Sequence, residues 1–124
     1  MICADTCSLI AYLRGETGSD VNAVDQALIQ QTLALAPPSL TELISDPSLP
    51  AAAEAFVLAV PQLEITPGYW ERAGKLRRKI LDHRYRARIA DTLIAQSCLD
   101  HDVALITRDQ DFKAFQKIAG LRLL

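Results

Sequence analysis

Short apolar segments alternate along the chain with longer segments whose apolar side chains recur at helical spacing. The clearest apolar segment, residues 103–106, is nearly continuous, which is typical of a strand covered on both faces. Strands that alternate with helices predict an α/β fold on a parallel sheet with right-handed crossovers. We expect strands at 2–4, 32–36, 63–65, 103–106 and 121–124, and helices at 8–13, 20–31, 50–60, 67–83, 89–100 and 112–118, with another short helix starting at Ser39 or Thr41.

Two of these helices carry more detailed expectations. Gly15 follows the first helix and is expected to cap its C-terminal end. In the 67–83 helix, Trp70, Ala73, Leu76 and Ile80 are expected to face the core, with cations on the opposite face.

The composition fits an ordinary folded domain. With 124 residues, half of them hydrophobic, the chain can bury a core of its own. No stretch of about 18 apolar residues suggests a transmembrane helix. The first residues lack the basic region of a signal peptide, and the cysteine count is odd, so we expect a cytoplasmic protein without disulfides.

The cysteines lack metal-binding spacing. Cys3 and Cys98 lie in apolar runs and are expected to be buried. Cys7 is a weak candidate for a nucleophile, because only His83 and His101 could serve as its histidine base.

The net charge of −2 conceals a separation of charge. Eight of the thirteen cationic residues fall in one short segment, where Glu71 and Asp82 are the only acids. These cations are Arg72, Lys75, Arg77, Arg78, Lys79, Arg84, Arg86 and Arg88. The rest of the chain is therefore strongly acidic.

Several acids follow predicted strands or begin the helices after them. Asp5 comes directly after the first strand, and Asp109 comes three residues after the 103–106 strand. Glu42 is near the start of the helix after the 32–36 strand, and Asp91 is in the first turn of its helix. Because ligands in open α/β sheets gather outside the carboxyl ends of the strands, we expect these acids on one edge.

Taken singly, these acids have ordinary structural explanations. Asp5, Asp91 and Asp111 can each favour a helix dipole by about 0.3–1 kcal/mol. Glu42 can complete a capping arrangement with Ser39. Gathered at one edge, however, the acids would repel one another. Two negative charges about 4 Å apart repel by about 4 kcal/mol at an effective dielectric near 20. A divalent ion with oxygen ligands, Mg²⁺ or Mn²⁺, is the expected counter-ion.

Four acid-bearing segments, residues 4–15, 39–43, 89–95 and 105–112, resemble in order the motifs of PIN-domain ribonucleases, specifically the VapC-type toxins of bacterial toxin–antitoxin pairs. The resemblance covers essentially the whole chain. It implies that residues 1–124 form one PIN-like domain, with a Rossmann-like three-layer α/β/α fold around a parallel sheet of about four to five strands.

The resemblance also implies roles for individual residues. The catalytic, metal-binding acids would be Asp5, Glu42, Asp91 and Asp109. Asp111 matches a more variable acid and is a further candidate ligand, while Thr6 and Thr107 match hydroxyl positions that support the site. Cys7 stands where serine is commoner, which should alter hydrogen bonding near the site and not metal binding.

By the same resemblance, the reaction is hydrolysis of RNA phosphodiester bonds with Mg²⁺ or Mn²⁺, which leaves 5′-phosphate and 3′-hydroxyl ends. A small VapB-like antitoxin, often inserting an arginine into the acidic pocket, and a homodimer are the implied partners. An apolar surface at Ile10, Leu13, Leu43 and Phe56 suits either partner, although these residues can equally belong to the core.

The run Arg84-Tyr85-Arg86-Ala87-Arg88 interleaves an aromatic ring with three arginines just before the Asp91 helix. Arginine binds phosphate with two parallel hydrogen bonds, and a tyrosine can stack on an unpaired base. We expect RNA contacts at Arg84, Tyr85, Arg86 and Arg88. In contrast, Lys75, Arg78 and Lys79 can be explained as a solvated helix face.

Other functions fit the motifs less well. An aspartate-based phosphatase would need a second acid two residues after Asp5, where Cys7 stands. A receiver module would need a lysine after the 103–106 strand, and Arg108 is a poor substitute. A catalytically silent PIN-like RNA-binding or regulatory module stays open as the alternative to the nuclease.

Overall fold

In the computed structural model, which describes residues 1–124, three short parallel strands form the centre of the molecule. They are β1 (Ile2–Ala4), β2 (Leu33–Ala34) and β3 (Ala104–Ile106), in the order β2-β1-β3. Cys3 of β1 pairs with Ala34 on one side and with Leu105 on the other. All three residues are fully buried, as expected for a parallel sheet covered on both faces.

Single bridges continue the parallel pattern at both edges of the sheet. Leu35 pairs with Gln62, and Leu105 pairs with Leu123. The strands expected at 63–65 and 121–124 do not form. Only a single bridge remains near each, at Gln62 just before the first range and at Leu123 within the second, so the sheet has three strands instead of four to five. After the buried Leu63, residues 64–68 are mostly exposed, and an edge cut short in this way offers little template for further strand pairing.

Seven helices connect and cover the strands. They are α1 (Thr6–Leu13), α2 (Ser19–Ile29), α3 (Pro37–Ile44), α4 (Ala51–Ala59), α5 (Tyr69–Asp82), α6 (Ile89–His101) and α7 (Phe112–Ala119). The predicted alternation of strands and helices is confirmed, and every strand pairing is parallel. None of the helices combines the length and the apolar character needed to cross a membrane.

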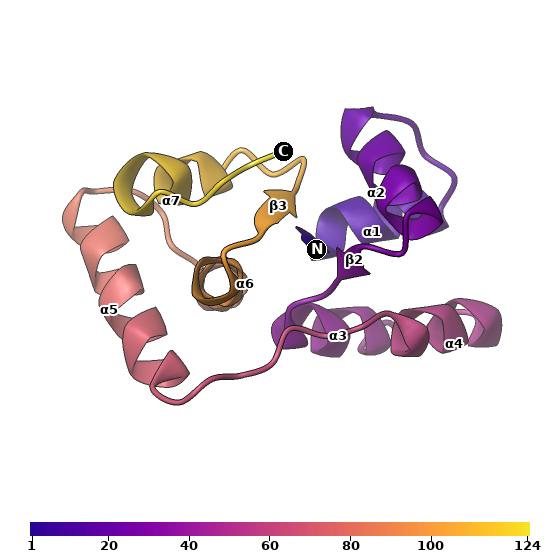
Figure 1. Cartoon of the computed structure of the whole chain (residues 1–124), viewed down its shortest axis with the longest axis horizontal. Helices are drawn as coiled ribbons and strands as arrows, with labels where there is room; N and C mark the ends of the chain where they lie inside the picture. Colours follow the sequence, from indigo (N-terminus) through magenta and orange to yellow (C-terminus); the bar gives the residue numbers. More distant parts are fainter.

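Alternate residues of each strand face opposite sides of the sheet and build two cores. Cys3 and Leu105 belong to one core, with buried residues of α5, α6 and α7. Ala4 and Ile106 belong to the other, with buried residues of α1, α2, α3 and α4. Figure 1 shows the same division, with α5, α6 and α7 on one side of the strands and α1–α4 on the other. The predicted three-layer α/β/α architecture is confirmed.

Two helices start at least two residues earlier than expected, each for a local reason. α1 begins at Thr6 because the Asp5 carboxylate caps it, accepting a hydrogen bond from Thr6 N at 2.8 Å. α3 begins at Pro37 because proline, which has no N–H, suits a first turn where that group would be unpaired. At the end of α1, Gly15 has a φ of +71°, as its expected capping role requires.

The buried face of α5 is the expected one at Ala73, Leu76 and Ile80 and differs only in the first turn, where Tyr69 replaces Trp70. Tyr69, Ala73, Leu76 and Ile80 point inward at helical spacing. Trp70, which we expected in the core, is 61% exposed. The Tyr69 hydroxyl donates a hydrogen bond of 2.6 Å to the backbone carbonyl of Leu93 on α6. This contact holds Tyr69 inward, so its neighbour Trp70 faces outward.

Candidate metal centre

Parallel strands bring two loops with polar side chains to the same edge of the sheet. Asp5 directly follows β1, and Thr107 directly follows β3. The Asp5 carboxylate is buried, and its Oδ1 accepts a hydrogen bond from Thr6 N. Its Oδ2 accepts hydrogen bonds from Thr107 Oγ1 at 2.9 Å and from Cys7 Sγ at 3.0 Å. Three donors therefore fix the orientation of this carboxylate.

Glu42 reaches the same edge from α3. Pro37 starts α3 soon after β2, so Glu42 lies in the second turn of the helix. Thr6 Oγ1 donates a hydrogen bond of 2.7 Å to Glu42 Oε1. Because Glu42 is exposed, it borders the site on the side open to solvent.

Asp91, Asp109 and Asp111 form the tightest group of acids. Each offers a carboxylate oxygen, and these oxygens all lie within 4.8 Å of one another. The loop after β3 is held by its own hydrogen bonds: Asp109 N donates to Thr107 Oγ1 at 3.0 Å, and Asp111 N donates to Asp109 Oδ1 at 2.9 Å. The three acids are half-buried, so an ion or ligand from solvent can reach their carboxylates.

Burial and mutual repulsion perturb the acids of this edge. Burial, followed by the charges of Asp5 and Asp109, raises the pKa of Asp91 to about 6. Burial also raises the pKa of Asp5 above its ordinary value in spite of its three hydrogen bonds, and the charge of Asp109 adds to the rise. A divalent cation would offset this repulsion, and carboxylate oxygens are the ligands that Mg²⁺ and Mn²⁺ prefer.

The structure thus gathers the whole predicted set of acids and hydroxyls at one edge of the sheet. Hydrogen bonds connect Thr6 to Glu42 and Thr107 to Asp5, and the charges of Asp5 and Glu42 both act on Asp91. The set is Asp5, Thr6, Glu42, Asp91, Thr107, Asp109 and Asp111. That these acids act as metal ligands remains a prediction.

Cys7 contacts the site as a neutral group. Burial and the adjacent charge of Asp5 raise the pKa of Cys7 to about 11, so its thiol is protonated near neutral pH. The ring nitrogens of His83 and His101 instead lie 2.8 and 2.7 Å from backbone carbonyls of Lys79 and Glu64. These contacts favour a structural role for Cys7 as a hydrogen-bond donor to Asp5.

Asp20 and Arg108 form a brace beside the site that the sequence analysis missed. Arg108 donates to Asp20 through Nε at 2.8 Å and Nη2 at 3.1 Å, and to Glu16 through Nη1 at 3.1 Å. Ser8 of α1, which is fully buried, donates to Asp20 at 2.8 Å. The hydrogen bond from Arg108 holds the pKa of Asp20 below its usual value. The brace ties the loop after β3 to the start of α2.

Several cations of the basic segment have structural partners. Arg72 forms a bidentate ion pair with Asp100, donating hydrogen bonds through Nε at 3.0 Å and Nη2 at 2.7 Å. Arg77 Nε donates to the backbone carbonyl of Ala87 at 2.7 Å. These contacts fix α5 against α6 and against the loop that joins the two helices.

The residues predicted to contact RNA lie exposed in that loop, between α5 and α6. Arg86 lies 3.8 Å from Asp111 of the acidic group, and the charge of Arg88 partly offsets the rise in the pKa of Asp91. The Tyr85 hydroxyl accepts a hydrogen bond from Lys117 at 3.2 Å. Arg84, with a φ of +68°, turns the chain just after α5. The loop therefore borders the acidic group, and its contact with RNA remains a prediction.

Comparisons with known proteins bear on the fold. The PIN domain family model matches residues 2–118. The structure is similar to that of VapBC2 from Rickettsia felis bound to a DNA fragment from their promoter, with 20% identity, a TM-score of 0.75, and coverage of 100% of this chain and 98% of that chain. No sequence among curated proteins matches.

Two further solved structures are similar over the whole chain. FitAcB from Neisseria gonorrhoeae has 19% identity and a TM-score of 0.71, over 100% of this chain and 96% of that one. FitAB bound to an IR36 DNA fragment has 18% identity and a TM-score of 0.74, over 100% and 94%. At these identities the likeness is one of fold.

Proposed function

The chain belongs to the PIN domain family, and we propose that it is a divalent-metal-dependent ribonuclease that acts as the toxin of a toxin–antitoxin pair. The observation that carries this proposal is the convergence of Asp5, Asp91 and Asp109, from distant parts of the sequence, on one edge of the sheet. Burial raises the pKa of both Asp5 and Asp91, and carboxyl groups perturbed in this way cluster at functional sites.

The donors suit a hard divalent ion. Asp91, Asp109 and Asp111 offer closely spaced oxygens, and Asp5 and Glu42 would complete the set. A site of carboxylates alone favours Mg²⁺ or Mn²⁺ over ions that prefer nitrogen or sulfur ligands. When bound, the ion supplies Lewis acidity that activates water and offsets charge on the phosphate.

The chain's own residues would position this chemistry. Thr107 and Thr6 hold Asp5 and Glu42 through hydroxyl hydrogen bonds of 2.9 and 2.7 Å. Both oxygens of Asp5 accept hydrogen bonds from the protein, so the fold itself sets the orientation of that carboxylate. Such preorganisation spares the site from reorganising during the reaction.

Arginines beside the acids support RNA as the substrate. Arg84, Arg86 and Arg88 are exposed in the loop between α5 and α6, and Arg86 lies next to Asp111. Their guanidinium groups would bind phosphates flanking the cleaved bond, while Tyr85 would stack on an unpaired base. A polyanion cut at an acidic site needs such cations to offset repulsion between its phosphates and the carboxylates.

The partner in this proposal is a small antitoxin that docks between α1, α3 and α4. A groove of about 210 Å³ there is lined by Ile10 and Leu13 and extends to Glu42. A basic side chain from a segment in this groove would reach the acids and take the place of the ion's charge. The solved complexes of VapBC2 and FitAB support a partner of this kind. We also propose that two copies of the chain form a homodimer.

The four residues expected either on that apolar surface or in the core differ in their exposure. Leu43 is buried in the core, and Ile10, Leu13 and Phe56 are only half-buried against it. Ile10 and Leu13, together with the buried Leu43, line the proposed docking groove, whereas Phe56 lines a separate hollow with Leu28.

The test of the proposal is RNA cleavage with Mg²⁺, with EDTA, and after Mg²⁺ is restored. We expect cleavage only when the metal is present, with 5′-phosphate and 3′-hydroxyl product ends. An Asp109→Asn protein purified in parallel should be inactive, which excludes a contaminating nuclease. RNA binding without cleavage under all conditions would instead favour the silent PIN-like module. If cleavage is observed, sequencing the 5′-phosphorylated ends after brief expression would identify the RNA that is cut.

A further inference from the structure

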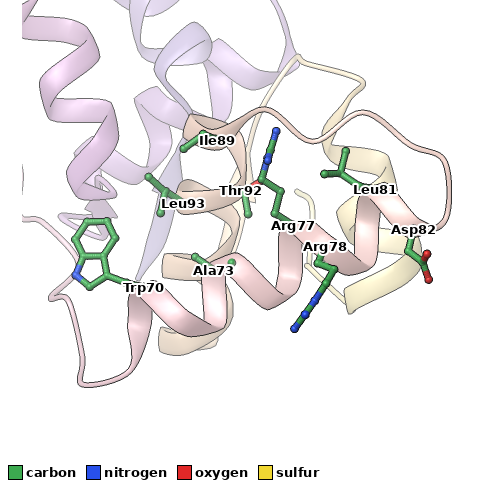
Figure 2. Close-up of a pocket in the computed structure, with 10 residues that line it drawn as sticks. Trp70, Ala73, Arg77, Arg78, Leu81, Asp82, Ile89, Thr92 and Leu93 are labelled. Carbon is green, nitrogen blue, oxygen red and sulfur yellow. The ribbon is translucent and has the colours of Figure 1, made fainter.

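A groove of about 670 Å³ runs between α5 and α6, outside the acidic site. Figure 2 shows Trp70 at one end of the groove, Ile89 and Leu93 on the α6 side, and Arg77 and Arg78 further along α5. Trp70 is 61% exposed and Ile89 is 62% exposed, so much of the apolar lining is open to solvent.

A neighbouring hollow lies between this groove and one acid of the candidate metal centre. A second hollow, of about 380 Å³, shares Trp70, Ile89 and Leu93 with the groove and is also lined by Glu42. The two hollows therefore adjoin at these three residues, with Glu42 lining one hollow and the arginines of α5 lining the other.

The cations of the groove are available to an anionic ligand. Arg77 uses its Nε on the backbone carbonyl of Ala87, and neither Arg77 nor Arg78 takes part in an ion pair. One acid, Asp82, also lines the groove, and Figure 2 shows it near the end of α5, beyond Leu81. An open aromatic ring followed by two arginines without ion pairs is the combination that single-strand binders use for bases and phosphates.

We propose that this groove holds a single-stranded segment of the RNA substrate, with an unpaired base stacked on Trp70 and neighbouring phosphates bound by Arg77 and Arg78. The inference rests on the proposed function, since the adjoining hollow is lined by Glu42, one of the acids assigned to cleavage. A second copy of the chain is the competing occupant. In a two-fold interface centred on this groove, Arg77 and Arg78 of both copies would face one another, so the charge favours RNA.

Trp70 gives a direct readout because it is the only tryptophan in the chain. The full-length protein is titrated in EDTA with a single-stranded RNA of about 12 nucleotides, within the site size of single-strand binders. Base stacking is expected to quench the tryptophan fluorescence in a saturable way. In parallel, the anisotropy of labelled RNA gives the affinity of the wild-type protein and of each variant.

Four variants separate stacking from general electrostatics. Trp70→Ala should weaken binding by roughly 5- to 100-fold, and Trp70→Phe, which keeps an aromatic face, should retain most of the affinity. Arg77→Gln with Arg78→Gln should lower the slope of log affinity against log salt by about 1.4, for two phosphate contacts on a single strand. The matched control is Lys75→Gln with Lys79→Gln, which removes equal charge from the exposed side of α5 outside the groove and should change the slope less.

The outcomes distinguish this inference from the proposed function. With Mg²⁺, Trp70→Ala should raise KM for RNA cleavage while kcat stays near the wild-type value. Cleavage with an unchanged KM, and no quenching in EDTA, would overturn the groove assignment and leave the nuclease intact. Quenching without any cleavage would support the groove and remove the nuclease. Sedimentation showing a dimer that Trp70→Ala dissociates, with no quenching by RNA, would assign the groove to a second copy.

Discussion

The hydroxyl of Thr107 donates a hydrogen bond of 2.9 Å to Oδ2 of Asp5, a residue 102 positions earlier in the chain. The contact joins the ends of β1 and β3, neighbouring parallel strands whose loops carry acids of the candidate metal centre. Because Thr6 and Cys7 also donate to Asp5, the protein itself fixes the carboxylate at the middle of the site.

Asp5→Asn should abolish RNA cleavage without unfolding the protein. The asparagine oxygen can still accept the hydrogen bond from Thr6 N. The change also removes a buried carboxyl group whose pKa is raised, which means that burial disfavours its charged form. We expect an unchanged or higher melting temperature and a loss of activity of at least about 100-fold. Thermal melting and a cleavage assay on the same preparation measure both effects. A fully active Asp5→Asn enzyme, purified free of contaminating nuclease, would count against the site.

Asp91 should make the stability of the metal-free protein depend on pH. Its pKa is about 6 in the folded state against an ordinary value of 3.8, so between these values the folded state binds more protons than the unfolded state. Stability from this group is therefore present at low pH and is lost as pH rises through about 6.

The matching experiment compares the wild-type protein with Asp91→Asn in EDTA. The variant should melt at a higher temperature than wild type near pH 7.5, and the difference should shrink near pH 4.5, where Asp91 is largely protonated in the folded protein. A difference that stays the same at both pH values would show that Asp91 does not titrate as described.

Ser39→Ala should leave the protein as stable or make it more stable. Ser39 is fully buried, and its hydroxyl has no hydrogen-bond partner in the protein. Since an unpaired buried polar group costs about 1–3 kcal/mol, its removal should raise the urea midpoint at an unchanged m value. The control is Ser97→Ala, which removes a hydrogen bond of 3.3 Å to the Tyr69 oxygen and should lower the midpoint. Destabilisation by Ser39→Ala would reveal a partner for the hydroxyl, such as a buried water.

Arg84→Gln combined with Arg86→Gln should weaken RNA binding and flatten its salt dependence. Each lost phosphate contact on a single strand lowers the salt slope by about 0.7, so the double variant should lose about 1.4. Fluorescence anisotropy across a salt titration, without divalent ions, measures the slope. Arg122→Gln serves as the control, because that cation pairs with Asp102 and not with the acidic group. An unchanged slope in the double variant would exclude the loop from the RNA interface.

Strands and helices that are specified by local residue patterns were predictable from the sequence. The apolar run at 103–106 forms β3, the first strand ends at Asp5, and helical spacing identified the helices with small errors at their ends. The meeting of the acids at one edge followed from the parallel strands. The sheet edges were not predictable. Gln62 pairs with Leu35 and Leu123 pairs with Leu105, and each of these pairings depends on a distant strand and involves a single residue of the edge segment.

The faces of helices and the braces between loops depended on tertiary contacts. Tyr69 and Trp70 both lie at helical spacing from Ala73, so the spacing does not distinguish them, and the buried ring is the one whose hydroxyl bonds to Leu93 and Ser97 of α6. Asp20 looks like an ordinary acid in the first turn of a helix. Its partner Arg108 lies 88 positions away, and no local pattern links the two residues.

Whether these acids share one divalent-ion site is tested most directly by Mn²⁺ binding, measured by isothermal titration calorimetry at neutral pH. Wild-type protein should bind Mn²⁺ saturably, and Asp91→Asn and Asp109→Asn should each weaken binding at least about 10-fold. Asp25→Asn, which removes an exposed acid of α2, should bind as wild type does. Equal binding by all four proteins, or no saturable binding by the wild type, would contradict a shared metal site.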